Sequence, residues 1–220
     1  MLRTLLLYGD YWHATAPFHP ALKHALGDAV DALTLRAHPD SFDAESLRDT
    51  DLLVLCKESV VPGTHNTPQQ RNWLFREQEL EILRWVEGGG LLFVWHSGAA
   101  GYSEDGLQTV FGGRFMGHPP IHPFQVKVTR PDHPLAAGVE EFTVTDELYH
   151  FSVEDSEAFQ VFLEGVSDEH GITEPIAWTH THGQGEVITY LLGHLAPTLK
   201  HASSRQLLSN LVARARARTA

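Results

Sequence analysis

Four short and almost unbroken apolar segments stand out in the first half of the chain. They are Leu5–Tyr8, Ala32–Leu35, Leu52–Leu55 and Leu91–Trp95. Such segments are typical of strands covered on both faces, and strands of that kind are parallel. Between the third and fourth segments, residues 68–87 carry apolar side chains at helical spacing and end at three glycines, while 17–26 and 40–50 are shorter helix candidates. This order predicts βαβ crossovers and an open sheet with helices on both faces.

After Gly101 the pattern changes to alternating apolar and polar positions, which indicates half-exposed antiparallel strands. The expected strands are 124–129, 141–144, 158–163, 176–178 and 187–192, with a short helix over 106–111 and a terminal helix over 199–215. Gly183-Gln184-Gly185 has the composition of a hairpin turn before the last strand. We therefore predict a single domain over residues 1–220, of the α/β class, whose mostly parallel sheet carries an antiparallel extension.

Charge and composition narrow the classes of function. The 220 residues include 16 Lys and Arg against 28 Asp and Glu, a net charge of -12 that disfavours nucleic acid and anionic membranes as partners. No apolar stretch approaches the roughly 18 residues of a membrane helix. A single cysteine, Cys56, suits a reducing compartment, so we expect a cytoplasmic protein. The unusual feature is 15 histidines, which titrate near neutrality and bind metals.

Several histidines directly follow the predicted strands. In an open α/β sheet, ligands bind outside the carboxyl ends of the strands. His13 lies shortly after the first strand, His96 follows the fourth and His194 follows the last, while the third ends in Cys56-Lys57-Glu58. We therefore expect a small-molecule site at this edge of the sheet.

The segment 91–101 resembles a nucleophile elbow, a tight turn from a strand into a helix. Val94 stands where the pattern requires glycine, and His96 occupies the position of the nucleophile. Imidazole there suits a base or a metal ligand, although His96 as a simple hydrogen-bonding group in a loop is an equal alternative. Ser97 is a weaker candidate for a nucleophile.

Two further segments carry candidate polar groups. The glycine-rich loop 111–119 contains Arg114 and His118, and it lacks the Lys-Ser/Thr pair of a phosphate-binding P-loop, so we expect no nucleotide. In 145–150, alternation in an extended segment would turn Glu147 and Tyr149 toward the same space. A solvated acidic turn is the alternative for that segment.

In this order the motifs resemble the ThuA-like family, named for trehalose utilisation, over nearly the whole chain. The resemblance rests on Gly90-Leu91-Leu92-Phe93-Val94-Trp95-His96-Ser97-Gly98, Phe111-Gly112-Gly113-Arg114-Phe115, Gly117-His118-Pro119, Asp132-His133-Pro134-Leu135, Thr145-Asp146-Glu147-Leu148-Tyr149, Pro175-Ile176-Ala177-Trp178, Gly183-Gln184-Gly185-Glu186-Val187 and Leu192-Gly193-His194. It implies a flavodoxin-like, class I glutamine amidotransferase-like fold without the catalytic cysteine. It also implies a role in sugar metabolism, on oxidised keto-glycosides.

The resemblance assigns roles to particular residues. His96, His118 and Glu147 are the implied catalytic groups, and a divalent zinc, manganese or iron ion is implied at His96, His118 and His194. Substrate contacts are expected from His13, Trp95, Arg114 and Tyr149. The family usually has Gly-Ile or a similar pair before its histidine, so Trp95 is expected to narrow or reshape the pocket.

The working hypothesis is a carbohydrate-acting lyase, isomerase or hydrolase that uses acid and base groups next to a carbonyl. His96 or Glu147 would remove a proton, His118 or His194 would polarise oxygen, and Tyr149 would orient the sugar. The alternative is a non-catalytic carbohydrate- or metal-binding module, in which Trp12, Trp95 and Tyr149 only stack on the ligand. Amidotransfer is disfavoured because Cys56 is not at the elbow. Assembly into a homo-oligomer is left open.

Overall fold

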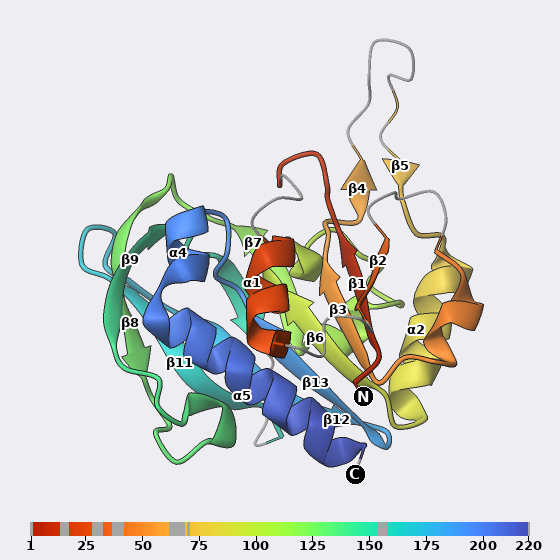
Figure 1. Cartoon of the computed structure of the whole chain (residues 1–220). Coiled ribbons are helices and arrows are strands. Elements are labelled where there is room, and N and C mark those ends of the chain that lie inside the picture. Colours follow the sequence, from red (N-terminus) through yellow and green to blue (C-terminus); the bar gives the residue numbers. More distant parts are fainter. Residues whose placement is uncertain are drawn as a thin grey trace.

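A nine-stranded sheet forms the centre of the computed structural model, which describes residues 2–13, 18–27, 33–36, 42–61, 69, 71–153 and 158–219 (Figure 1). The strand order is β2-β1-β3-β6-β13-β12-β11-β8-β9. Its first five strands are parallel, and four of them were predicted to be so: β2 (Leu33–Arg36), β1 (Thr4–Tyr8), β3 (Leu52–Cys56) and β6 (Leu91–Trp95). The fifth, β13 (Gly185–Tyr190), was expected in the antiparallel extension, but it is fully buried and pairs in parallel with β6. Their carboxyl ends lie at one edge of the sheet.

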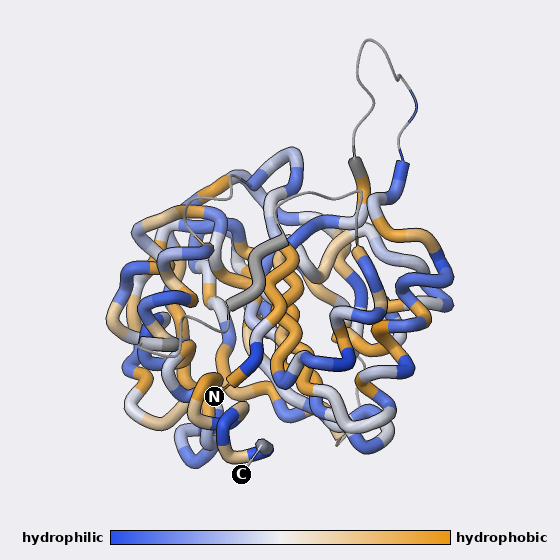
Figure 2. Tube along the Cα trace, turned by 45° about the vertical axis from the view of Figure 1, so that its right-hand side comes forward, coloured by the Kyte–Doolittle hydropathy of each residue, from blue (hydrophilic) through white to orange (hydrophobic). Residues whose placement is uncertain are grey.

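The apolar parallel strands are buried because helices cover both faces of the sheet. Leu6 and Tyr8 pack toward α1 (Phe18–Leu26) and α5 (Ala202–Arg218), whereas Leu5 and Leu7 pack toward α2 (Arg76–Glu87). Shorter helices are η3 (Ala44–Leu47), η4 (His96–Ala99), α3 (Gln108–Phe111), η5 (Pro134–Ala136) and α4 (Ala196–Lys200). Figure 2 shows the hydrophobic strands running through the middle of the molecule, between more hydrophilic outer segments. None of the helices in the described ranges is long and apolar enough to span a bilayer.

The antiparallel extension is also present as predicted. It consists of β12 (Ile172–His182), β11 (Gln160–Ser167), β8 (His122–Val128) and β9 (Phe142–Asp146). The hairpin between β12 and β13 turns at Gly183, whose φ of 61° lies in the left-handed region that favours glycine. Two small antiparallel pairs flank the sheet, β7 (Gly113–Gly117) with β10 (His150–Val153), and β4 (Val60–Val61) with β5 (Arg71–Asn72).

The helix predicted over 68–87 is shorter than expected and begins at Arg76. Before it, Arg71 and Asn72 pair as a strand with β4, and Pro68 lies outside the described residues. The side chain of Gln78 accepts a hydrogen bond from the backbone N–H of Phe75 and so fixes the start of the helix. The apolar Trp73 and Leu74, which suggested a longer helix, are buried outside it.

Candidate functional site

Four side chains from distant parts of the sequence meet at the carboxyl edge of the sheet. His13 follows β1, His96 follows β6, Glu147 follows β9 and His194 follows β13. One ring nitrogen or carboxylate oxygen from each lies within 4.8 Å of all the others. The three histidines meet because they follow parallel strands, whose carboxyl ends lie at the same edge of the sheet, whereas Glu147 follows the antiparallel strand β9.

A cavity of about 370 Å³ opens above this cluster, a size typical of small-ligand sites. It is lined by Trp12, His13, Glu58, Ser97, Ala100, Phe115, His118, Glu147, Tyr149 and His194. His96 is fully buried, and its Nε2 atom lies within hydrogen-bonding distance of His13 and Tyr149 in the wall. Imidazole and carboxylate groups therefore form the polar side of a cavity whose other walls are largely aromatic.

His96 sits on a tight and strained turn. Its φ of 47° is a left-handed value that a non-glycine residue rarely adopts, and η4 begins there directly after β6. The turn packs closely on β3, since a Cβ atom on Gly98 would meet the carbonyl oxygen of Leu55 at 1.9 Å. The His96 side chain is anchored by donation from Nδ1 to the carbonyl oxygen of Leu191, at 2.7 Å.

The protonation of His96 follows from these contacts. Burial, reinforced by the neighbouring His13, holds the pKa of His96 well below its usual value, so the ring is neutral near pH 7. Because Nδ1 carries the single proton and donates it to Leu191, Nε2 presents a lone pair. That lone pair faces Nε2 of His13 at 3.0 Å.

Asp10 orients His13 in a similar way. Its Oδ1 atom accepts hydrogen bonds from Nδ1 of His13 at 2.6 Å and from the backbone N–H groups of Trp12 and His13, while Oδ2 accepts from the backbone N–H of Glu58. Burial opposes the ionised form, but these hydrogen bonds outweigh it and lower the pKa of Asp10 to about 2. With Nδ1 as the donor, a neutral His13 presents the lone pair of Nε2 to the cluster.

Glu147 lies between three histidines. Its Oε1 atom is 3.4 Å from Nε2 of His118 and 3.3 Å from Nδ1 of His194, and its Oε2 atom is 3.6 Å from Nε2 of His96. Asp146 holds this part of the backbone in place, since its Oδ1 atom accepts from the N–H groups of Glu147 and His194. Burial raises the pKa of Asp146.

The donor set fits one divalent cation. Two imidazole lone pairs that face each other at 3.0 Å repel unless a proton or a cation lies between them. The buried Nδ1 atom of His194 lies 3.3 Å from Glu147 but makes no hydrogen bond within the described structure. Zinc ligands at about 2.0–2.2 Å from the ion are separated by roughly 3.3–3.6 Å in a tetrahedron. Three of the separations here are 3.0, 3.3 and 3.6 Å, and all lie within 4.8 Å. The hydrogen bonds that Nδ1 of His13 donates to Asp10 and Nδ1 of His96 donates to Leu191 match the outer contacts that orient metal-bound histidines.

His118 and Tyr149 stand beside the group of four. His118 is not one of its members, but its side chain is 32% exposed, lines the cavity and stacks on Tyr149 with the ring planes 21° apart. Burial raises the pKa of Tyr149 well above its usual value, so its hydroxyl remains protonated. As predicted for 145–150, Glu147 and Tyr149 line the same space, although β9 ends at Asp146 and β10 begins only at His150.

Two residues expected to touch the substrate lie elsewhere. Trp95 is completely buried, packs on Phe18 and donates from Nε1 to the carbonyl oxygen of Leu192, so it supports the fold and does not line the cavity. Arg114 lies on the exposed side of β7 and pairs with Glu104 at 3.1 Å. The alternation of β7 instead turns Phe115 toward the cavity.

The structure also brings in residues that sequence reasoning did not assign. Asp10 and Asp146 organise the cluster, and Glu58 lines the cavity. Trp12, which the sequence suggested only as a stacking group of the binding-module alternative, lines it as well. Asp10 and Glu58 follow β1 and β3 within two residues, so the rule of searching the strand ends had already indicated their segments. Their roles depend on hydrogen-bond geometry that a sequence does not contain.

Comparison with known proteins decides the family. A family model described as ThuA, trehalose utilisation, matches residues 5–213. The chain belongs to the ThuA family. No curated protein matches it.

Solved structures agree with this ThuA assignment at the level of the fold. A ThuA-like protein from Parabacteroides merdae is 17% identical, with a TM-score of 0.70 and coverage of 95% of this chain and 88% of that one. A second, from Bacteroides uniformis, is 17% identical with a TM-score of 0.65, covering 94% and 88%. A protein from Thermoplasma acidophilum, described as one of the subunits of GMP synthase, is 12% identical with a TM-score of 0.63, covering 99% and 95%. The fold is therefore class I glutamine amidotransferase-like.

Within this ThuA-family chain the amidotransferase-like turn carries an imidazole. His96 stands directly after β6, while Cys56 is the last residue of β3 and is fully buried. Burial raises the pKa of the Cys56 thiol well above its usual value, which suppresses the reactive thiolate. The geometry favours acid, base or metal chemistry over thiol chemistry.

Proposed function

We propose that this ThuA-family chain is a metal-assisted lyase that acts on keto-glycosides. The observation that carries the proposal is Glu147, a carboxylate placed among His96, His118 and His194 at the wall of a cavity of small-molecule size. Base groups and a protonated phenol lie side by side there, as proton transfer next to a carbonyl requires. The keto-glycoside as substrate class comes from the family resemblance.

His13, His96, Glu147 and His194 are the residues that would hold the ion. A divalent ion in that position supplies Lewis-acid polarisation of the ketone oxygen. The chain's own residues orient the donors, because Asp10 and the carbonyl of Leu191 fix which nitrogen of His13 and His96 carries the proton.

His118 is the proton acceptor in this proposal. It lines the cavity and is partly exposed, whereas His96 is fully buried and its free nitrogen faces His13. Nδ1 of His118 donates to the carbonyl oxygen of Pro119, which leaves Nε2 as the basic atom. Tyr149 orients the sugar with its protonated hydroxyl and its ring face.

The reaction proposed is an elimination. Nε2 of His118 takes the proton from the carbon between the ketone and the anomeric carbon. The released electron pair forms a carbon–carbon double bond to the anomeric carbon, and the glycosidic carbon–oxygen bond breaks. The leaving oxygen takes up a proton from water, and His118 returns its proton to the solvent. The products are an unsaturated keto sugar and an alcohol.

Incubation of the zinc- or manganese-loaded protein with 3-keto-glycosides in deuterated water tests this function. We expect release of the alcohol and the vinyl signal of the unsaturated keto sugar, together with exchange of deuterium into unreacted substrate at the carbon between the ketone and the anomeric carbon, all detected by NMR. His118→Ala should lower the rate about 10²–10⁴-fold, the usual contribution of a general base. His170→Ala, at an exposed histidine outside the cavity, should leave it unchanged. Saturable binding without exchange or product would instead indicate a non-catalytic sugar-binding module.

A further inference from the structure

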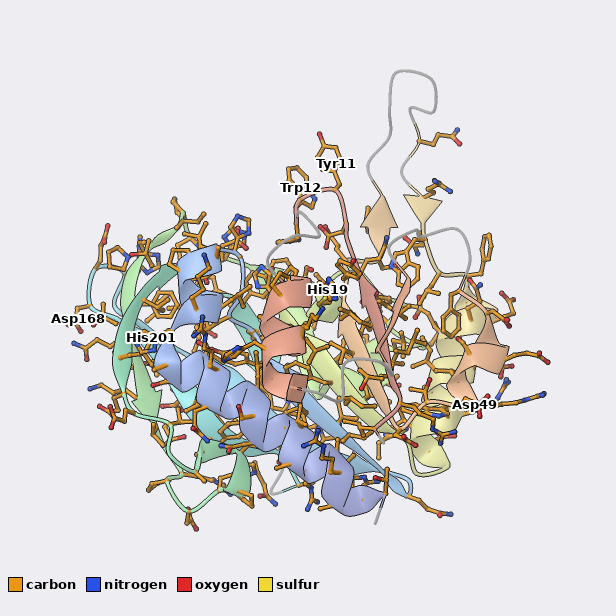
Figure 3. All side chains as sticks on the ribbon, in the orientation of Figure 1. Tyr11, Trp12, His19, Asp49, Asp168 and His201 are labelled. Carbon is orange, nitrogen blue, oxygen red and sulfur yellow. The ribbon has the colours of Figure 1, made fainter. Side chains whose placement is uncertain are left out.

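The cavity has two chemically different kinds of lining. His13, Glu147 and His194 of the His/Glu cluster line it with polar groups, and Trp12, the residue before His13, lines it with an aromatic ring. Tyr11 and Trp12 are 68% and 60% exposed, and they project together from the body of the molecule (Figure 3). Exposed aromatic side chains beside a cavity are typical of a ligand-binding surface, because a bound ligand that covers them removes apolar area from water.

The backbone of this aromatic pair is held in place. Oδ1 of Asp10 accepts from the backbone N–H of Trp12 at 2.9 Å, and the same atom binds the ring of His13 at 2.6 Å. The rings of Tyr11 and Trp12 meet edge to face, with centroids 4.7 Å apart. Asp10 thereby holds the backbone of Trp12 and the ring of His13 in a fixed relation to each other.

We propose that Trp12, supported by Tyr11, forms an outer subsite that stacks on a ring in the leaving group of the glycoside. The proposal rests on the proposed function and adds to it that the substrate class is glycosides with a ring on both sides of the scissile bond. A keto sugar at the cluster directs its leaving group toward the opening, where Trp12 offers a flat apolar face. Sugar rings and aryl rings both have such a face, so the shared chemistry is a flat or chair-shaped ring.

Steady-state kinetics with three substrates test the subsite. A methyl 3-keto-glucoside carries no ring in its leaving group, 3-keto-trehalose carries a sugar ring and a phenyl 3-keto-glucoside carries an aryl ring. We expect Trp12→Ala to raise KM about tenfold for the two ring-bearing substrates, the loss of one stacked ring, with little change in kcat. KM for the methyl glycoside should stay unchanged, and Trp12→Phe should restore most of the affinity.

Phe75→Ala is the matched control, because Phe75 is 70% exposed and lies outside the cavity lining. Equal KM changes for all three substrates, or none, would overturn the subsite while leaving the proposed function intact. A rise in KM for 3-keto-trehalose alone, or for the phenyl 3-keto-glucoside alone, would support the subsite and identify the kind of ring that it binds. A wild-type protein that processes none of the three would overturn both proposals.

Discussion

Replacing Glu147 with glutamine is expected to lower kcat/KM for a keto-glycoside about 10²–10⁴-fold. The carboxylate is the one anionic group among three histidine nitrogens at 3.3–3.6 Å, and the amide removes its charge while keeping its shape. A neutral amide is a poor ligand for a divalent transition metal and does not pair with a protonated imidazole. The measurement is steady-state kinetics on the metal-loaded protein.

The control is Glu141→Gln, at a carboxylate that is 51% exposed and pairs with Lys127. It should keep wild-type kinetics. In the metal-free state both variants should unfold near the wild-type temperature, because the backbone N–H of Glu147 donates to Asp146 whichever side chain residue 147 carries. Wild-type kcat/KM in the Glu147→Gln variant would remove this residue from the reaction centre.

Asp10→Asn is expected to lower activity and metal affinity about 10–100-fold although the substituted side chain touches no substrate. The two oxygens of Asp10 accept hydrogen bonds from His13 on one side and from the backbone N–H of Glu58 on the other. An asparagine places an NH₂ group at one of these positions. Either it opposes the N–H of Glu58, or it moves the proton of His13 from Nδ1 to Nε2 and removes the lone pair that faces the cluster.

Metal titration together with kinetics distinguishes this positioning role from a loss of fold. The expected pattern is weaker metal binding by a chain that still unfolds in one cooperative transition, at a somewhat lower temperature because a buried hydrogen-bonded carboxylate is lost, and partial recovery of turnover at high metal concentration. Asp49→Asn, at an exposed carboxylate paired with Arg3, is the matched control. Normal metal affinity in the Asp10→Asn variant would show that Asp10 stabilises only the backbone around residues 10–13 and does not position His13 for metal binding.

Much of the fold could be predicted because the parallel strands consist almost entirely of apolar residues. A segment such as Leu91–Trp95 has no polar position, so its burial on both faces follows from its composition. Because every position in such a segment is apolar, the pattern does not indicate which side chains point to which face of the sheet. Trp95 packs with Phe93 on the α1 side, and nothing in an unbroken apolar run indicates that direction in advance.

The location of the site could be predicted from the sequence, but which side chains contact one another within it could not. The strand-end rule located His13, His96 and His194 at one edge, and the structure places them there. The suggested metal ligands His96, His118 and His194 differ from the group in the structure, where His13 and Glu147 join and His118 stands beside Glu147. Glu147 lies between β9 and β10, and His118 directly follows β7. The positions of these strands depend on pairing between distant segments, β8 with β9 and β7 with β10, which the sequence pattern does not reveal.

Calorimetric titration of the metal-stripped protein with zinc or manganese tests whether His13, His96, Glu147 and His194 form one centre for a divalent cation. We expect about one ion per chain for the wild type and for His170→Ala, and loss of that binding in a His13→Ala/His194→Ala double variant that still folds. A wild-type chain that binds no ion, or a double variant that binds as tightly as the wild type, would contradict such a centre.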